Sequence, residues 1–390
     1  MLTTQECLEC LYKQAKRTQK IVCDARAESA QIKTTQAESS LLDSGAESKK
    51  VDSKNLDSRE IDSAILDSSA KSSAQNAESK KLDSSVPKSK TLESNFPKSN
   101  STESKADSTS TKSILSESIF LESAPPNFTP QDVAIPSAPP PCPPPKLAIS
   151  VYERIAKILH DSDPYAALKS KSIAKAKDFI RDLRVRYDPD SSLDFGLKIA
   201  VLGNVIDYGS ANAFDIESCA FDAKSMHFGA YDITALKSRL KSARKLVYIG
   251  DNAGEDVFDS VCVRILRVLY PSLEIAYFTR GAPIINDITM RDLHANNSPI
   301  LHACEVVDSG VRSAGFIYEL ANPHARAIYD EADVILAKGM GNFECLESCN
   351  DPRVFLLFKV KCAVVAQFLR QQEGVFMLKQ CAPESKIARI

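Results

Sequence analysis

The sequence predicts an α/β protein whose mostly parallel sheet is covered by helices on both faces. In the second half of the chain, continuous apolar runs alternate with segments of helical periodicity. Strands buried on both faces read as continuous apolar runs, and parallel strands need a crossover between them, usually a helix. The first half shows helical patterns that are interrupted by a long polar segment. We therefore expect a helical N-terminal region with an insertion, followed by an α/β domain at residues 241–390.

The apolar runs define the expected strands and the segments between them define the expected helices. The runs are residues 245–249, 273–279, 303–307, 333–337, 353–359 and 374–378. Helical periodicity lies between most of them and is clearest at 256–269 and 313–330. An apolar run of five to seven residues is the length of a buried strand, whereas these periodic segments are long enough for helices.

Three further helices are expected upstream. Residues 4–24 form one amphipathic pattern, in which Thr4 is placed to cap the helix. Cys7, Cys10, Leu11 and Ala15 are expected to share its buried face. Residues 147–160 and 165–185 have the same periodicity. We assign residues 1–25 and 147–240 to a single helical subdomain.

Residues 26–146 separate the two parts of this subdomain. They are rich in Ser, Lys, Asp and Glu, and end in the proline run "APPPCPPPK". Short units recur, such as "AESKKVDS" at 46–53 and "AESKKLDS" at 77–84, so a folded repeat is the alternative interpretation. The composition favours a disordered insertion, because it cannot bury enough apolar surface to offset the entropy of ordering. We expect that removing residues 30–140 leaves the site intact.

Composition excludes several classes of protein. The 49 basic and 51 acidic residues nearly balance, which argues against a dedicated nucleic-acid binder. No apolar run is long enough to span a membrane, and the N-terminus lacks the apolar core of a signal peptide. The 11 cysteines show no disulfide framework, so reduced thiols and a cytoplasmic location are expected. The sequence contains no GxxxxGK[ST] motif, which argues against a P-loop NTPase.

Polar residues follow almost every expected strand. The segments are "GDNAGE" (250–255), "TRGAPIIND" (279–287), "DSG" (308–310), "KGMGNFE" (338–344) and "KVKC" (359–362). In open parallel sheets, ligands bind outside the carboxyl ends of the strands. Each residue alone has a simpler explanation: Asp251 or Asn252 as a helix cap, and Arg280 or Lys338 as a surface charge. The repetition at one edge favours a binding site.

The residue types indicate a metal and a phosphate. Asp and Asn supply hard oxygen ligands that suit Mg²⁺ or Mn²⁺ better than zinc, and the five His do not cluster. Gly339 and Gly341 allow the backbone to approach a ligand closely, and Lys338 is an anion-binding side chain. Attack on phosphorus by a metal-activated water would be the reaction, although attack by a carboxylate stays open.

Several segments together resemble the metal-dependent damage-control phosphatases, especially their prokaryotic branch with an N-terminal CxxC. The matching segments are "DNAGEDVFD" (251–259), "RGAPIINDIT" (280–289), "KGMGNFE" (338–344), "KCAVVA" (361–366), "CLECLYKQA" (7–15), "DPYAALK" (163–169) and "GNVIDYG" (203–209). The resemblance covers about residues 4–24 and 147–380 and implies a Rossmann-like α/β domain. The long polar insertion departs from the family's pattern.

The resemblance also implies an activity and its residues. It assigns the metal ligands to Asp251, Asn252 and Asp287, and a phosphate-binding, catalytic role to Lys338. The cofactor would be Mn²⁺, Mg²⁺, Co²⁺ or Ni²⁺, and the substrates sugar phosphates or damaged phosphometabolites. The remaining residues implied for the pocket are Glu255, Arg280, Asn286, Gly339, Gly341, Asn342, Asn204 and Asp207. The alternatives are a non-catalytic phosphometabolite-binding or scaffold protein and, more remotely, a protein carboxyl methyltransferase.

A few residues have two open interpretations. Cys7 and Cys10 form a CxxC, but the sequence holds no second CxxC, so packing or a redox-sensitive pair is favoured over zinc. His294 and His302 are expected at the surface. Met340 and Phe343 are candidates for either the substrate pocket or the core.

Overall fold

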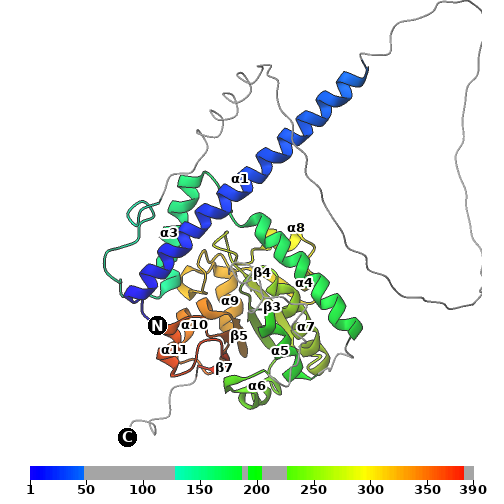
Figure 1. The fold of residues 1–390 in the computed structure, drawn as a ribbon. Coiled ribbons are helices and arrows are strands. Elements are labelled where there is room, and N and C mark those ends of the chain that lie inside the picture. The colour runs from blue at the N-terminus through cyan, green and yellow to red at the C-terminus, as the bar shows by residue number, and fades with distance from the viewer. Residues whose placement is uncertain (48–127, 187–191, 204–225, 382–390) are drawn as a thin grey trace, which may run out of the picture. The chain divides into compact units, whose positions relative to one another are not determined.

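A computed structural model describes residues 1–47, 128–186, 192–203 and 226–381 of the chain. Contacts divide the chain into two units, residues 1–31 with 124–390 and residues 32–123. The first unit contains the sheet and the covering helices (Figure 1). The second contains the last part of helix α1, and the rest of it lies outside the described residues. Most of the segment predicted to be disordered, residues 26–146, lies outside the described residues.

The first unit is built on a seven-stranded, mostly parallel sheet, which confirms the predicted fold class. The strand order is β1-β7-β6-β5-β2-β3-β4. Strands β2 to β6 are parallel, β7 is antiparallel to β6, and β1 is parallel to β7. The strands are β1 (Phe228–Tyr231), β2 (Lys245–Ile249), β3 (Glu274–Thr279), β4 (Glu305–Asp308), β5 (Val334–Lys338), β6 (Val354–Lys359) and β7 (Phe376–Gln380).

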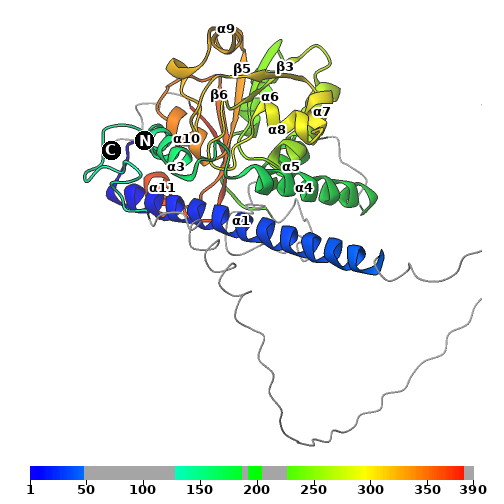
Figure 2. The same cartoon turned by 90° about the horizontal axis from the view of Figure 1, so that it is seen from above.

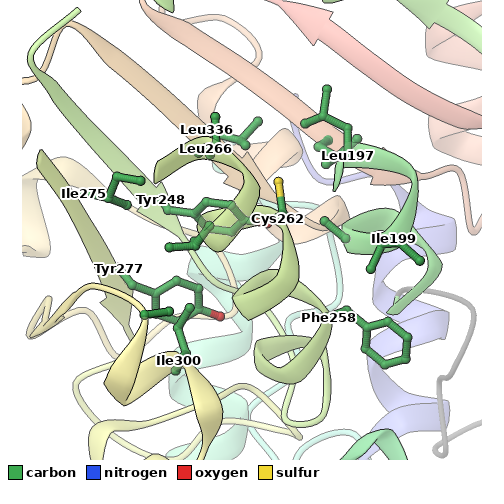
Figure 3. Close-up of a cluster of buried hydrophobic side chains, with 14 of the residues drawn as sticks. Leu197, Ile199, Tyr248, Phe258, Cys262, Leu266, Ile275, Tyr277, Ile300 and Leu336 are labelled. Atoms are coloured by element: carbon green, nitrogen blue, oxygen red, sulfur yellow. The ribbon is translucent and has the colours of Figure 1, made fainter. Parts of the chain in front are cut away.

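Helices cover both faces of this sheet (Figure 2). Because side chains alternate along a strand, Tyr248 of β2 lies in one core and Ile249 in the other. The first core also contains side chains of α4 (Ala166–Arg186), α5 (Leu193–Leu202), α6 (Ile233–Leu240) and α7 (Glu255–Leu269). The second contains side chains of α9 (Pro323–Glu331), α10 (Met340–Leu346) and α11 (Ala363–Leu369). Figure 3 shows Tyr248 and Tyr277 beneath Cys262 and Leu266 of α7.

The N-terminal helix buries only part of the predicted face: Leu11 and Ala15 are buried as predicted, and the two cysteines are not. Helix α1 (Gln5–Glu47) buries residues at intervals of three and four: Leu8, Leu11, Ala15, Thr18 and Val22. Cys10 is exposed and Cys7 is half-buried, so the predicted face containing both cysteines is wrong. Leu11, Ala15 and Val22 join a third core with α3 (Pro144–Leu159) and Ile284, which lies in the loop after β3. The helical region therefore packs directly on a loop of the sheet edge.

The bounds expected for the insertion, residues 26–146, also need correction. Helix α1 continues past residue 25 as far as Glu47. At the other end, Phe128 and Val133 are buried in the third core, and Tyr12 donates a hydrogen bond to the carbonyl of Phe128 at 2.9 Å. Isolated apolar residues in a polar segment carry no local signal that they will be buried. A deletion of residues 30–140 would therefore remove part of the core.

The helix expected at 313–330 is shorter than predicted. Helix α9 begins at Pro323, and Asn322 caps it by accepting a hydrogen bond from the amide of Ala325 at 2.8 Å. Residues 313–322 form a loop with one short 3₁₀ turn, η3 (Tyr318–Leu320). An Asn-Pro pair marks a helix start, whereas periodicity alone extended the prediction too far. Strand β1 was not predicted, because it is only four half-buried residues long.

The strand order creates a topological switch point between β2 and β5, at the carboxyl ends of the parallel strands. From β2 the chain adds β3 and β4 on one side, and then returns to add β5 and β6 on the other side. The carboxyl ends of β2 and β5 therefore lie side by side where the strand order reverses, which is where open α/β sheets bind ligands. Among the described residues, no helix is long and apolar enough to cross a membrane.

Candidate functional site

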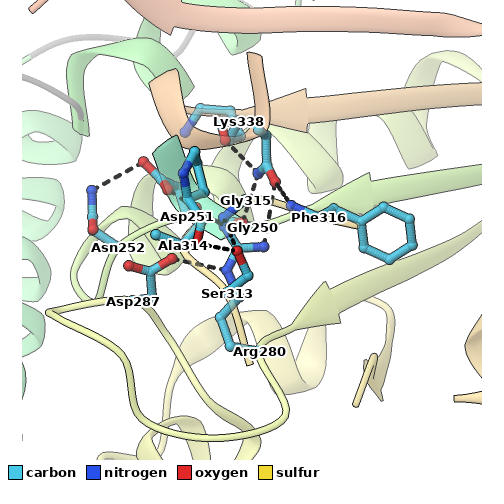
Figure 4. A network of polar contacts seen from close by, with 12 residues as sticks. Gly250, Asp251, Asn252, Arg280, Asp287, Ser313, Ala314, Gly315, Phe316 and Lys338 are labelled. Atoms are coloured by element: carbon cyan, nitrogen blue, oxygen red, sulfur yellow. Dashed lines mark hydrogen bonds and ion pairs between the residues drawn. The ribbon is translucent and has the colours of Figure 1, made fainter. Parts of the chain in front are cut away.

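The loops after β2 and β3 meet at the switch point and bring the predicted ligands together. The backbones of Asn252 and Asp287 form an isolated antiparallel bridge. The amide of Ile288 donates to the carbonyl of Asp251 at 2.9 Å, and the amide of Ala253 donates to the carbonyl of Asn286 at 2.9 Å. The side chains of Asp251 and Asp287 are almost fully buried. Figure 4 shows Asp251, Asn252 and Asp287 gathered at this point.

The amide of Asn252 is oriented by two carboxylates. Its Nδ2 donates to Asp251 Oδ2 at 3.0 Å and to Glu255 Oε1 at 2.9 Å. Carboxylates accept hydrogen bonds, so the NH₂ end must face them and the carbonyl end must face away. Asn252 Oδ1 is therefore presented as an acceptor beside Asp251 and Asp287.

Arg280 is an internal residue that holds Asp287. Its Nε donates to Asp287 Oδ1 at 2.8 Å, and its guanidinium also donates to the Ala314 carbonyl at 2.8 Å and to Asn342 Oδ1 at 3.4 Å. A further ion pair joins it to Asp251 at 3.6 Å. The side chain is 1% exposed, so the surface-charge interpretation is wrong. These contacts make Arg280 a support for the carboxylates, and its substrate-binding role stays a prediction.

Lys338 also points inward. Its Nζ donates to Glu255 Oε2 at 3.0 Å and to Asp259 Oδ1 at 2.8 Å, and the side chain is 0% exposed. Burial alone would lower the pKa of Lys338, but the charges of Asp259 and Glu255 raise this pKa above its ordinary value. The alternative interpretation of Lys338 as a surface charge is therefore wrong, and its phosphate-binding role stays a prediction. Two of the three N–H bonds of the ammonium are taken, which leaves at most one for a phosphoryl oxygen.

The carboxylates of the site are in excess over its cations. Burial, and then the charges of Glu255 and Asp287, raise the pKa of Asp251 well above its ordinary value, although Arg280 and Lys361 act in the opposite direction. Burial raises the pKa of Asp287 to about 6, despite its ion pair with Arg280. In the ion-paired network, four carboxylates (Asp251, Glu255, Asp259 and Asp287) share the two cations Arg280 and Lys338.

This donor set fits a hard divalent cation. Two buried carboxylates and an amide oxygen are ligands of the kind that Mg²⁺ and Mn²⁺ prefer, and a double positive charge would balance the two surplus carboxylates. The described residues contain no cluster of three or more His, Cys, Asp or Glu side chains suited to a metal ion. A metal at Asp251, Asn252 and Asp287 would therefore complete its coordination with water or substrate oxygens.

The residues after β5 pack closely against Asp251 and the loop around Ala314. Gly339 has φ of 84°, and a Cβ there would lie 1.9 Å from Asp251 Oδ2, so only glycine fits. A Cβ on Gly341 would lie 2.3 Å from the Ala314 carbonyl. Asn342 is 0% exposed and ties three segments together: it accepts from the Phe316 amide at 2.6 Å and donates to the carbonyls of Lys338 and Gly250 at 2.6 and 3.3 Å. These contacts indicate support of the loop.

Other predicted site residues have simpler outcomes. Asn286 is half-buried and contributes its carbonyl to the bridge between the two loops. Asn204 and Asp207 lie outside the described residues. His294 and His302 are exposed, as expected. Phe343 is fully buried and stacks on Phe358 with ring centroids 4.6 Å apart, and Met340 packs on the same core.

Sequence reasoning missed two lysines near the site. Lys361 follows β6, and its positive charge opposes the overall rise in the pKa of Asp251. Its position in "KVKC", directly after a predicted strand, was the signal that could have identified it. Lys169 of α4 is 0% exposed and bonds Asp163 at 2.8 Å and Asp292 at 2.7 Å. Asp292 closes a capping box with Thr289, two residues after Asp287. Asp163 is only six residues away, but Asp292 is 123 residues away, so nothing in the sequence indicated that Lys169 would be buried between them.

Comparisons with known proteins agree with this geometry. The sequence matches the damage-control phosphatase ARMT1-like domain over residues 3–375. A damage-control phosphatase of Pyrococcus horikoshii is 31% identical over 230 residues, which are 58% of this chain and 78% of the relative. One from Archaeoglobus fulgidus is 28% identical over 236 residues, or 60% and 81% of the two chains.

A solved structure supports the same assignment. The crystal structure of a DUF89 family protein from Pyrococcus horikoshii matches with a TM-score of 0.54 and 30% identity, covering 60% of this chain and 82% of that one. The family match extends over nearly the whole chain and includes every segment that forms the site at the switch point. The chain therefore belongs to the family of damage-control phosphatases with an ARMT1-like domain.

Proposed function

We propose that this chain is a divalent-metal-dependent phosphatase that hydrolyses phosphate esters of small metabolites. The observation that carries the proposal is the buried set of Asp251, Asn252 and Asp287 at the switch point, within a network that has two more carboxylates than cations. The names of its relatives, which are damage-control phosphatases, support the phosphatase part of the proposal.

Each residue has a distinct task in this proposal. Asp251, Asn252 Oδ1 and Asp287 would hold the ion, which supplies Lewis-acid polarisation of the phosphoryl group. Arg280 fixes Asp287 through its 2.8 Å ion pair. Lys361 places a positive charge near Asp251, where the negative charge of a phosphate ester would lie. Such preorganised charges stabilise the charge that develops on the transferring phosphoryl group.

The proposed substrates are sugar phosphates or damaged phosphometabolites, and the proposed location is the cytoplasm. The cysteines of the described residues are free thiols, which suits a reducing compartment. The metal screen described next identifies which of Mn²⁺, Mg²⁺, Co²⁺ and Ni²⁺ gives the highest activity.

A metal screen combined with a panel of phosphate esters tests the proposal. We expect the purified chain to release phosphate from an aryl phosphate and from several sugar phosphates only when a divalent ion is added. Asp287→Ala should abolish both Mn²⁺ binding in calorimetry and phosphate release, because it removes a proposed ligand and breaks the 2.8 Å ion pair with Arg280. Asp351→Asn is the matched control: its ion pair with Arg353 lies just before β6, at the opposite end of the strands.

Two results would count against the proposal. If Asp287→Ala binds Mn²⁺ as tightly as the parent in calorimetry, the ligand assignment is wrong. A parent chain that binds phosphorylated metabolites but releases no phosphate with any of the ions would instead be a non-catalytic binding protein.

A further inference from the structure

Beneath the site lies a buried carboxylate that was not among the predicted site residues. Asp259 of α7 is 0% exposed and accepts hydrogen bonds from three side chains. Tyr248 and Lys338 donate to its Oδ1 at 2.6 and 2.8 Å, and Tyr277 donates to its Oδ2 at 3.0 Å. Burying an ion pair is rarely favourable compared with packing apolar side chains in the same volume. The position of this cluster therefore calls for an explanation other than stability.

The cluster continues without a break to a predicted metal ligand. Lys338 Nζ bridges Asp259 Oδ1 to Glu255 Oε2, at 2.8 and 3.0 Å. The other oxygen of the same carboxylate, Glu255 Oε1, accepts the Asn252 amide at 2.9 Å. Asp259 and Glu255 are one turn apart on α7, so both face the end of β5. The chain of contacts thus runs from the tyrosines in the core to the amide that faces the metal site.

We infer that Asp259 is a positioning residue for the metal ligand Asn252, acting through Lys338 and Glu255. This inference rests on the proposed function, because it requires Asn252 to bind a metal ion. Two tyrosines fix Asp259, Asp259 fixes the ammonium of Lys338, and Lys338 fixes the Glu255 carboxylate that turns the NH₂ end of Asn252 away from the ion. Glu255, which contacts the ligand itself, is one contact removed from the ion, and residues in that position typically change metal affinity or activity by ten- to a hundredfold. Asp259 acts from two contacts further away, so its effect should be smaller.

The chain of contacts gives Lys338 a second task. If the lysine only met a phosphoryl oxygen, its loss would leave Mn²⁺ affinity unchanged. If Lys338 also links Asp259 to the Glu255 carboxylate that orients Asn252, the loss of Lys338 or of Asp259 weakens Mn²⁺ binding even without substrate.

The first experiment is Asp259→Asn, which keeps the size of the side chain and removes its charge. Mn²⁺ affinity is measured by calorimetry without substrate, and kcat/KM with an aryl phosphate. We expect Mn²⁺ affinity to fall by roughly threefold to tenfold, which is at or below the lower end of the effect of a residue that contacts the ligand itself. Asp351→Asn should keep the parental affinity. Tyr248→Phe removes one hydrogen bond from Asp259 and should cause a smaller loss in the same direction, which keeps the test valid if Asp259→Asn folds poorly.

A double-mutant cycle then tests the route. If Asp259 acts through Lys338, adding Asp259→Asn to Lys338→Met should cause little further loss of Mn²⁺ affinity. Residues that act independently give additive losses, whereas residues in one network do not. Circular dichroism and unfolding midpoints of all variants separate a loss of folded protein from a loss of affinity.

The outcomes decide between the inference and the proposed function. Parental Mn²⁺ affinity and kcat/KM in both Asp259→Asn and Tyr248→Phe overturn the inference and leave the proposed function standing. Additive losses in the cycle overturn the route through Lys338. A parent chain that binds no Mn²⁺ overturns the proposed function and the inference together.

Discussion

Two lysines of this protein are completely buried between pairs of carboxylates, yet they join different parts of the molecule. Lys338, at the end of β5, lies between Glu255 and Asp259, which are both on the adjacent helix α7. Lys169, on α4, lies between Asp163, which precedes that helix, and Asp292, which is 123 residues away on α8 (Met290–Ala295). Lys338 belongs to the carboxyl ends of the strands, where the candidate site lies. Lys169 connects the helical region to the segment that follows Asp287.

The two buried lysine networks end at different parts of the molecule. The Lys338 network ends on Asn252, so in the proposed function it would orient a ligand of the metal. The Lys169 network ends on the capping box after Asp287, so it fixes the loop as a whole, while Arg280 separately holds the Asp287 side chain. We therefore expect loss of Lys338 to act mainly on chemistry and loss of Lys169 to act mainly on stability.

The largest effect is expected for Lys338→Met. The substitution removes the charge that holds Glu255 and leaves two buried carboxylates without their cation. We expect kcat/KM for the best phosphate ester to fall by roughly a hundredfold or more, the scale seen when a preorganised charge is removed. Steady-state kinetics of folded protein measures the effect.

Lys245→Met is the matched control, because Lys245 starts β2 at the opposite edge and pairs with Glu331 on the surface. It should leave kcat/KM unchanged. If Lys338→Met keeps the parental kcat/KM, the two buried lysines do not differ as proposed.

Lys169→Met should reverse the balance between stability and activity. It leaves Asp163 and Asp292 buried with only Arg291 as a cation for Asp163, and breaking a buried pair costs about 3–5 kcal/mol. We expect the free energy of unfolding, measured in urea, to fall by about this amount. At temperatures where the variant is folded, kcat/KM should fall by less than for Lys338→Met, because Arg280 still holds Asp287. An opposite ranking of the two variants would contradict the comparison.

A smaller effect concerns Glu344 of α10, whose pKa burial raises to about 7. The folded state favours the protonated acid, so this group stabilises the fold at pH below about 4.5 and loses that contribution as pH rises through 7. Glu344→Gln should remove this loss. Between pH 5 and pH 8, the free energy of unfolding of the parent should therefore fall by about 1–3 kcal/mol more than that of the variant.

Urea unfolding at several pH values measures the difference. Glu331→Gln, a change to an exposed carboxylate, is the control and should follow the parent. Parallel curves for Glu344→Gln and the parent would show that burial of Glu344 has no such consequence.

The smallest effect is expected for removal of residues 48–123 with a short flexible linker in their place. These bounds keep Phe128 and Val133, which are buried in the third core. Because the segment is polar and its loop closes at a slowly rising entropic cost, we expect nearly parental kcat/KM and Mn²⁺ affinity. A large loss of turnover in a folded deletion variant would show that the insertion contributes to the site.

The sequence alone predicted the six main strands and the strand ends at which the polar residues of the candidate site gather. Continuous apolar runs are local features, and the residues directly after them must emerge at a strand end. This is why Asp251, Arg280 and Lys338 were located correctly, although residue type gave no indication of which way the charged side chains turn. Strand β1 was missed because four half-buried residues leave too weak a pattern.

Only the tertiary structure decided what the charged side chains do. Arg280 and Lys338 turn inward because carboxylates on other elements lie there to receive them, and Asp259, Asn342 and Lys169 acquire their roles from partners that are distant in sequence. The buried face of α1 was likewise set by the helices and the loop against which it packs. A strand's apolar run depends on the local chain, but the free energy of burying a charge depends on the charges that the whole fold places around it.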